Sequence, residues 1–294
     1  MQSGKLARTI NKVWKSKPTI EGAGVRLKRA FGFDQVPRLD PFLMLDSFRS
    51  DNPDDYRSGF PWHPHRGIET ITYLLAGEVE HGDSMGNRGV ISAGDVQWMT
   101  AGSGIIHQEM PKGDGQARLW GFQFWANLPA SHKMMDPRYR EVKRDDIPLV
   151  TTSDGTVVRV ICGEAAGVRG PVQDVVTDPD LLDVSMPAGT SFTHPVKAAH
   201  TVFTYVIEGE GNFGPRDGAV ACAADAVVLY EPGDAIVVAT EKQPVRFLLA
   251  AGRPLGEPVA WSGPIVMNTQ EELQAAIREY QEGTFVKHAR ARSA

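Results

Sequence analysis

The chain has 294 residues, a net charge of −5 and an apolar fraction of 41%, which is enough for two packed domains. Acidic and basic residues are interspersed, so no basic patch predicts direct nucleic-acid binding, and no run of about 18 apolar residues predicts a membrane helix. The N-terminal MQSGKLARTINKVWKS lacks the apolar stretch of a secretory signal, and two cysteines are too few for a disulfide framework. We therefore expect a cytoplasmic protein without membrane association.

The first half of the chain is predicted to be rich in strands. Polar and apolar residues alternate from about residue 5 to residue 31, and again over 118–128. Between them, residues 60–110 contain apolar runs broken by glycines, which is typical of antiparallel strands joined by tight turns. Residues 133–148 are charged and contain two prolines, so we expect a linker between two domains at 136–148.

The second half shows short β-type runs at regular spacing, and glycine or proline separates most of them. They lie at 157–162, 181–186, 202–207, 226–230, 235–239 and 245–250. Such spacing predicts an all-β sandwich or barrel. One helix is expected near the end, because Thr269 is a suitable N-cap, apolar residues recur at helical spacing from Leu273 to Tyr280, and Gly283 follows.

The two halves also resemble each other in sequence, which indicates a duplicated β-domain. ITYLLAGEVE, from Ile71, aligns with FTYVIEGEGN, from Phe203, and Gly94-Asp95 is aligned with Gly233-Asp234. With these offsets, the second copy has Pro195, Lys197, Arg246 and Leu248 where the first has His63, His65, His107 and Glu109. We therefore expect a working site in the first copy only.

These four residues form two pairs of metal-ligand type. His63 and His65 are two residues apart, as are His107 and Glu109, and residues i and i+2 of a strand point to the same side. If the sheet returns the second pair to the first, three imidazoles and one carboxylate converge on one ion. A lone H-x-H is often only a surface feature of a strand, but two such pairs favour a metal site.

The donor set suits a divalent transition ion such as Fe(II), Mn, Ni, Cu or Zn. Four protein ligands leave an octahedral ion two open positions for substrate and dioxygen or water. A structural zinc site would usually include cysteine, and none lies near these residues. The chemistry of the donor set therefore favours a reactive centre over a structural one.

Three neighbouring residues have open interpretations. Glu69 is either a solvent-facing strand residue or a group behind the ligands. Arg66 either pairs with a phenolate or carboxylate substrate or is a solvated charge at a strand end. His81 is expected in a turn after Glu80, where a ligand role is disfavoured.

The segment HPHRGIETITYLLAGEVEHGDSMGNRGVISAGDVQWMTAGSGIIHQE closely resembles the pirin family of the cupin superfamily, and GPIVMNTQEELQAAIREYQEGTF resembles the end of that family. The resemblance spans essentially the whole chain. It implies an all-β fold of two cupin-type (jelly-roll) β-barrels face to face, with a C-terminal helix. We accordingly expect a metal-binding domain at 1–135 and, after the linker, a metal-free domain at 149–294.

Carried over residue by residue, the pirin ligands are His63, His65, His107 and Glu109. The general cupin pattern instead takes its carboxylate four residues after the second histidine, which here is Glu69. We expect Glu109 to be the ligand, because it pairs with His107 at i, i+2, and we expect Glu69 to lie nearby. Either Glu109 or Glu69 is the candidate general base.

The resemblance implies two classes of function. Some pirins look like quercetinase-type dioxygenases, which open a flavonol ring with dioxygen and release carbon monoxide. Others look like iron-dependent, redox-sensing co-regulators that bind protein partners. The shared motif does not choose between them. We favour the enzyme, with Fe(II) as the expected ion, Mn, Ni, Cu and Zn as alternatives, and a small phenol and dioxygen as substrates; the alternative adds a regulatory protein partner.

Overall fold

The structure of the protein is a computed structural model that describes residues 6–288. Residue 5, where the first strands were expected to begin, and the two outer ends of the predicted domains lie outside the described residues. Contacts divide the chain into two compact units. The histidine-bearing unit contains residues 17–38, 42–144 and those from 255, and the second unit contains residues up to 16, 39–41 and 145–254.

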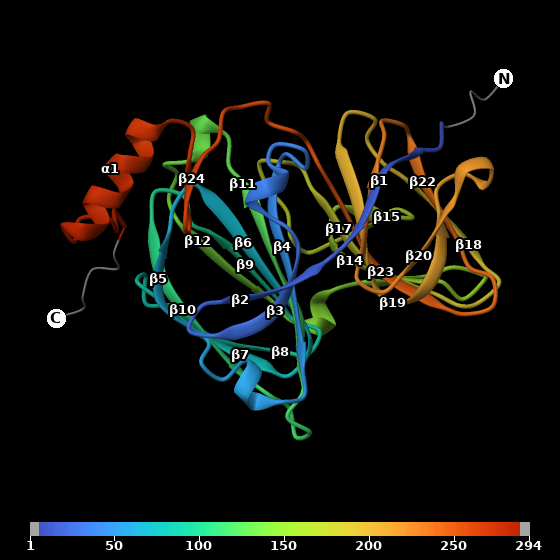
Figure 1. Ribbon diagram of the computed structural model, residues 1–294, viewed down its shortest axis with the longest axis horizontal. Coiled ribbons are helices and arrows are strands. Elements are labelled where there is room, and N and C mark those ends of the chain that lie inside the picture. Colours follow the sequence, from blue (N-terminus) through green and yellow to red (C-terminus); the bar gives the residue numbers. More distant parts are fainter. Residues whose placement is uncertain (1–5, 289–294) are drawn as a thin grey trace. The chain divides into compact units, whose positions relative to one another are not determined.

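The histidine-bearing unit is built from two antiparallel sheets. One has the order β12-β9-β6-β11-β4-β3-β2 and the other the order β5-β10-β7-β8. Figure 1 labels these strands. The strands are β2 (Lys17–Glu21), β3 (Val25–Phe31), β4 (Phe42–Ser50), β5 (Phe60–His65), β6 (Ile68–Ala76), β7 (Glu78–Asp83), β8 (Arg88–Ser92), β9 (Val96–Thr100), β10 (Ile105–Lys112), β11 (Leu119–Asn127) and β12 (Arg138–Val142). Short 3-10 turns lie at Phe33–Gln35, Pro53–Asp55 and Ala130–His132.

Alternation along the strands fills the interior of this unit. In β10, residues 105, 107, 109 and 111 are buried, whereas the residues between them are less so. At one end the interior is an apolar cluster that includes Val25, Phe48, Val79 and Leu119. His107 and Glu109 are buried on the inward face of β10, so these predicted ligands lie inside the unit and not on its surface.

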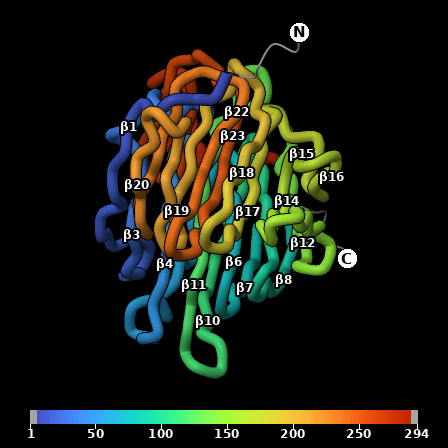
Figure 2. The backbone as a smooth tube through the Cα atoms, turned by 90° about the vertical axis from the view of Figure 1, so that its right-hand side faces the viewer, coloured from blue at the N-terminus to red at the C-terminus, as the bar shows by residue number. Residues whose placement is uncertain are grey.

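The second unit has a sheet with the order β1-β21-β19-β23-β17-β14-β13, on which β18, β20 and β22 fold over (Figure 2). Its strands are β1 (Ile10–Lys15), β13 (Leu149–Thr151), β14 (Val157–Cys162), β15 (Glu164–Ala165), β16 (Val168–Arg169), β17 (Asp180–Met186), β18 (Ser191–Pro195), β19 (Thr201–Phe213), β20 (Val220–Ala223), β21 (Ala226–Tyr230), β22 (Ala235–Ala239) and β23 (Val245–Gly252). Short 3-10 turns lie at Arg144–Asp146 and Arg216–Gly218. The predicted strands of the second half are therefore confirmed.

The strand orders show the duplication and correct one part of the alignment. β9-β6-β11-β4 of one unit corresponds to β21-β19-β23-β17 of the other, so β22 takes the place of β10. Gly233-Asp234 precedes β22, whereas Gly94-Asp95 precedes β9, so these two turns are not equivalent. The counterparts of the ligand strands are thus SFTHP and AIVVA, which contain one histidine and no carboxylate. The second unit therefore lacks the ligand set, as expected, but the residues at the equivalent positions differ from those that the alignment gave.

Each end of the chain belongs to a different unit from the residues that adjoin it in sequence. β1 pairs with β21 in the second unit, and residues from 255 belong to the histidine-bearing unit. The latter form β24 (Ala260–Ser262), β25 (Ile265–Met267) and helix α1 (Gln270–Gln281). The segment expected to be a linker contains β12, which pairs with β9, because its residues 138–142 supply an edge strand. The predicted domain boundaries otherwise stay a prediction.

The predicted all-β class with one C-terminal helix is confirmed for residues 6–288. Helix α1 begins after Thr269, whose side chain accepts a hydrogen bond from the backbone N–H of Glu272 at 3.2 Å. In turn, the side chain of Glu272 accepts a hydrogen bond from the backbone N–H of Thr269. Gly283, at φ 72°, follows its end. In the described part of the chain, no helix is long and apolar enough to cross a membrane.

Candidate metal centre

Two neighbouring strands bring the predicted ligands together. β5 and β10 are antiparallel, and His107 lies directly opposite His63. A bulge between His107 and Glu109 shifts the register, so Glu109 lies opposite Phe60. The sheet therefore places β10, which carries His107 and Glu109, beside β5, which carries His63 and His65, as predicted.

Three histidines converge. Among the described residues, one ring nitrogen of His63, one of His65 and one of His107 all lie within 4.8 Å of one another. The ring centroids of His63 and His107 are 4.4 Å apart, and those of His65 and His107 are 5.0 Å apart. His65 and His107 are buried and His63 is half-buried, so the cluster opens to solvent on the His63 side.

Backbone carbonyls fix the tautomers of two of these rings. The Nδ1 of His63 lies 2.8 Å from the Pro61 carbonyl, and the Nδ1 of His65 lies 3.0 Å from the Pro264 carbonyl. A carbonyl only accepts, so each Nδ1 carries the proton and each Nε2 carries a lone pair. The two Nε2 atoms are 3.1 Å apart, and a cation held between them removes the repulsion between these lone pairs.

His107 completes the argument for a metal. Both of its nitrogens are buried and have no hydrogen-bond partner among the described residues. Burial, followed by the neighbouring His65, His63 and His81, holds the pKa of His107 well below its ordinary value. Burial and His63 likewise lower the pKa of His65. Neutral, partly unsatisfied imidazoles are what a divalent transition ion binds, so the residues fit such an ion.

Glu109 is buried and firmly held beside the histidines. One carboxylate oxygen accepts from Thr72 Oγ1 at 2.9 Å and Gln97 Nε2 at 3.2 Å, and the other accepts from Gln123 Nε2 at 2.7 Å. Its oxygens are not within the 4.8 Å group that the three histidines form. Its place as fourth ligand is therefore a proposal, whereas its fixed orientation toward the interior is observed.

Glu69 lies elsewhere. Its carboxylate accepts from Thr100 Oγ1 at 2.7 Å, and burial raises its pKa against hydrogen bonds from Thr100 and Trp98 and the charges of Arg138 and Arg140. Along β6, Glu69 and Thr72 are three residues apart and so point to opposite faces, and Thr72 is the one that contacts Glu109. The geometry does not support the general-base role predicted for Glu69.

His81 is placed differently from the prediction. It lies within β7 and not in a turn, opposite Glu109 on β10. Its ring stacks on Tyr139 with centroids 4.7 Å apart, lies 5.4 Å from that of His107, and its Nε2 is 3.2 Å from an Asp83 oxygen. It is outside the metal-binding group but forms the wall behind His107.

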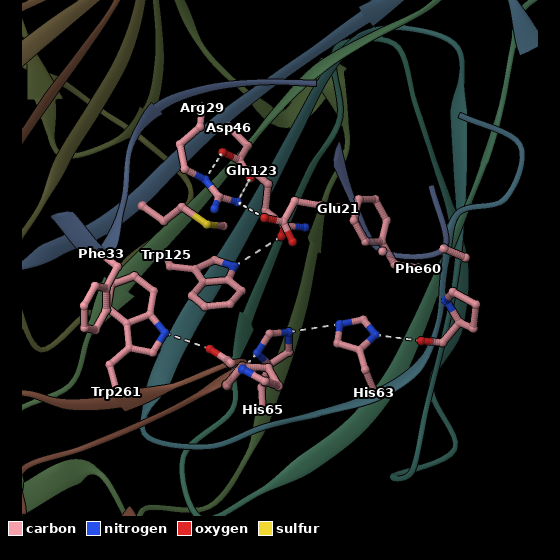
Figure 3. Close-up of a pocket in the computed structure, with 16 residues that line it drawn as sticks. Glu21, Arg29, Phe33, Asp46, Phe60, His63, His65, Gln123, Trp125 and Trp261 are labelled. Carbon is pink, nitrogen blue, oxygen red and sulfur yellow. Dashed lines mark hydrogen bonds and ion pairs between the residues drawn. The ribbon is translucent and has the colours of Figure 1, made fainter. Parts of the chain in front are cut away.

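A large pocket opens onto two of the three histidines, His63 and His65. Its volume is about 650 Å³, and aromatic side chains form much of its wall (Figure 3). These are Phe33, Phe60, Trp125 and Trp261. The Trp125 ring meets the edge of His65 with centroids 5.0 Å apart, so a flat molecule in the pocket would lie close to the histidines.

The other end of the pocket is polar. Arg29 forms a two-pronged ion pair with Asp46, at 2.9 and 2.7 Å, and its Nη2 also lies 2.9 Å from Glu21. Burial raises the pKa of Asp46, against the hydrogen bonds and charge of Arg29. In Figure 3, Trp125 is drawn between this cluster and His65. The pocket thus joins a metal-binding end to a polar end through an aromatic middle.

Family models match both halves of the chain. The model described as Pirin matches residues 24–126, and the model described as Pirin C-terminal cupin domain matches residues 181–286. The chain belongs to the pirin family. A pirin-like protein of Caulobacter vibrioides is 45% identical over 284 residues, which cover 95% of this chain and 99% of that protein. The predicted pirin resemblance is confirmed.

Solved structures agree with the cupin-type fold. The structure of a quercetin 2,3-dioxygenase from Acinetobacter baumannii matches with a TM-score of 0.87 at 31% identity, covering 95% of this chain and 98% of that one. A bacterial pirin from Escherichia coli in complex with nickel(II) matches with a TM-score of 0.63 at 22% identity, covering 83% and 99%. The second match shows the shared pirin fold alone.

The pirin-family site includes a C-terminal segment that the sequence did not point to. Arg66 is buried, which corrects both of its predicted roles. Its Nε donates to the Ser103 carbonyl at 2.7 Å, its Nη2 donates to the Phe285 carbonyl at 2.9 Å, and it pairs with Glu279 at 2.7 Å. Together with the bond from His65 to Pro264, these contacts fasten residues 264–285 to the ligand strand.

The residues that form the pocket walls were also not predicted from the sequence. Trp125 and Phe60 lie on predicted strands. Trp125 is two residues from Gln123 and so shares its inward face. Phe60 is three residues before His63, so regular alternation places it on the other face, and the irregular register between β5 and β10 turns it inward. Nothing local marks Trp261 or Pro264 as site residues, since both come from the far end of the chain. Trp62, next to His63 in sequence, has 53% of its surface exposed.

Proposed function

We propose that this pirin is a metal-dependent dioxygenase of the quercetinase type, which opens a flavonol-like phenolic ring with dioxygen. One observation carries the proposal: two members of a three-histidine cluster, His63 and His65, whose Nε2 lone pairs are 3.1 Å apart, line a pocket with aromatic walls. The structural similarity to a protein named quercetin 2,3-dioxygenase supports the same class of oxidoreductase.

His63, His65 and His107 would hold the ion, with Glu109 as the fourth ligand and Fe(II) as the expected metal. When bound, a divalent transition ion supplies the means for dioxygen, a triplet molecule, to combine with an electron-rich phenolate. Mn, Ni, Cu and Zn are alternatives that the same donor set accepts. The carbonyls of Pro61 and Pro264 keep the imidazoles in the tautomer that such binding needs.

The chain's own residues prepare the substrate. The aromatic wall at Trp125 and Phe60 binds the flat ring system and excludes water from it. Glu109, as general base, accepts the phenolic proton, and its bonds from Thr72 and Gln123 keep the carboxylate turned to the interior. At the far end, Glu21 and Asp46 offer acceptors to hydroxyl groups of the same substrate.

The test is dioxygen uptake with quercetin by protein reloaded anaerobically with Fe(II). We expect uptake with loss of the flavonol absorbance, and neither in His107→Ala. His132→Ala, in the short turn Ala130–His132 outside the pocket, is the matched control and should keep the activity.

If the metal-loaded protein takes up no dioxygen with quercetin or with other phenols, and with none of the alternative metals, the dioxygenase proposal is wrong. The redox-sensing co-regulator then becomes the better hypothesis. Its measurement is partner binding by protein loaded with Fe(II), with Fe(III) and without metal.

A further inference from the structure

A second, much smaller cavity lies within the histidine-bearing unit. Its volume is about 20 Å³. Most of its wall is apolar, formed by Val25, Phe48, Phe60, Val79, Pro111 and Leu119. Polar side chains, Thr72, Glu109 and Gln123, meet it where it approaches the metal centre. The large pocket described above does not include its apolar end.

The size of the cavity limits its occupant to one small molecule. A cavity of roughly 10–15 Å³ already holds a single water, so about 20 Å³ admits one water or one small gas molecule and nothing larger. A whole flavonol is far larger than this space. The cavity therefore needs an explanation other than binding of the organic substrate.

The chemistry of the wall disfavours water. A buried water needs two to four polar partners. Here the polar groups are already bonded to one another: Thr72 donates to Glu109 at 2.9 Å, and Gln123 donates to Glu109 at 2.7 Å. The side-chain amide oxygen of Gln123 accepts from Trp125 Nε1 at 3.1 Å. With its polar rim engaged and the remaining wall apolar, the cavity has the character of the dry cavities that bind apolar ligands and xenon.

The position of the cavity links it to the metal centre. Glu109 is two residues from His107 on the same inward face of β10. Phe60 and Gln123 line both this cavity and the large pocket, so the two spaces share walls. His63 and His65 also line the large pocket, so the shared walls place the cavity close to these two histidines.

From these observations we infer that the cavity is a dry binding site for one small apolar gas molecule, beside the histidine cluster. In the working enzyme that gas is dioxygen, an assignment that rests on the proposed dioxygenase function. An apolar site next to the reacting atoms raises the local supply of a gas that water dissolves poorly. Gas binding itself does not depend on turnover and can be tested without it.

The direct test is a crystal of the protein pressurised with xenon, which probes apolar gas sites. We expect a xenon atom in contact with Val25, Phe48 and Val79. Ordered water in the cavity, or a cavity without xenon when other sites are filled, would overturn the inference. Val79→Ile adds a methyl group to the wall and should abolish this xenon site, and Val25→Ile, which adds a methyl group at another wall residue, is the second variant if the first folds poorly.

The kinetic test separates gas supply from the chemistry. In Val79→Ile we expect the KM for dioxygen to rise severalfold, with the KM for the phenol and the metal content unchanged. Val228→Ile makes the same change at a buried valine of the second unit and should leave both KM values unchanged. An unaltered KM for dioxygen in a variant that has lost its xenon site would refute the supply role. If the wild type binds xenon but consumes no dioxygen, the proposed function fails and the gas site stands.

Discussion

Two of the buried histidines should make the stability of the metal-free protein depend strongly on pH. The pKa values of His65 and His107 lie well below 6.5 in the folded state, chiefly because burial disfavours the charged ring. As the pH falls below about 6.5, the unfolded chain takes up protons at these positions and the folded chain does not. The free energy of unfolding therefore decreases as the pH falls, and it recovers as the pH rises above that value.

The size of the effect follows from linkage. A ring that stays neutral in the folded state lowers the free energy of unfolding by RT ln(1 + 10^(6.5 − pH)), which is about 1.4 kcal/mol near pH 5.5. At pH 7 the same expression gives about 0.2 kcal/mol per ring, so His65 and His107 together lower the free energy of unfolding by about 2.5 kcal/mol between pH 7 and about pH 5.5. The loss continues with further acidification until the native rings are protonated.

The assay is urea unfolding of metal-free protein at several pH values, followed by tryptophan fluorescence. The double variant His65→Asn/His107→Asn should lose about 2.5 kcal/mol less than the wild type over this range. The control His132→Asn, in a short turn away from the cluster, should follow the wild type. Equal pH dependence in the wild type and the double variant would refute the claim that both rings are neutral in the folded state.

Three further predictions concern the supports of the site. Arg66→Lys should weaken metal binding about tenfold, measured by competition with a chelator, because the ligand strand loses its anchors to Phe285 and Glu279, whereas exposed Arg26→Lys should not. Glu109→Gln should destabilise the protein by about 1–3 kcal/mol in urea, since its amide N–H groups would face the donors of Thr72 and Gln123; an unchanged midpoint would contradict these bonds. Lys133→Met should cost about 3 kcal/mol or more by the same assay, because it leaves the acceptors of Gly67, Asn127 and Val266 without their donor; a smaller loss would show that water replaces it.

The convergence of the histidines was predictable because it depends on local rules. The i, i+2 spacing and the return of one strand beside another place His63, His65 and His107 together. The same rule fails for Glu69, since a turn at Gly67, with φ 78°, separates β5 from β6 and resets which face each position occupies. Counting four residues from His65 across this turn therefore says nothing about direction.

The remaining features depend on contacts between distant parts of the chain. Pro264 accepts from a ring 199 residues earlier, and β1 joins a sheet whose other strands begin after residue 148. No local pattern records such pairings. The alignment of Gly94 with Gly233 failed for a related reason, because Gly-Asp turns recur before several strands and only the sheet order distinguishes them.

The exchange of the terminal segments has a consequence for synthesis on the ribosome. The second unit receives its β1 before the rest of its sheet is translated, so its sheet can close as it emerges. The histidine-bearing unit is translated first, yet it lacks Pro264, Phe285 and helix α1 until all of residues 145–254 have been made. Until then the ring of His65 has no fixed tautomer and Arg66 has no carbonyl of Phe285 to bind. The metal centre is thus a late product of translation, completed only after its neighbour has had the time to fold.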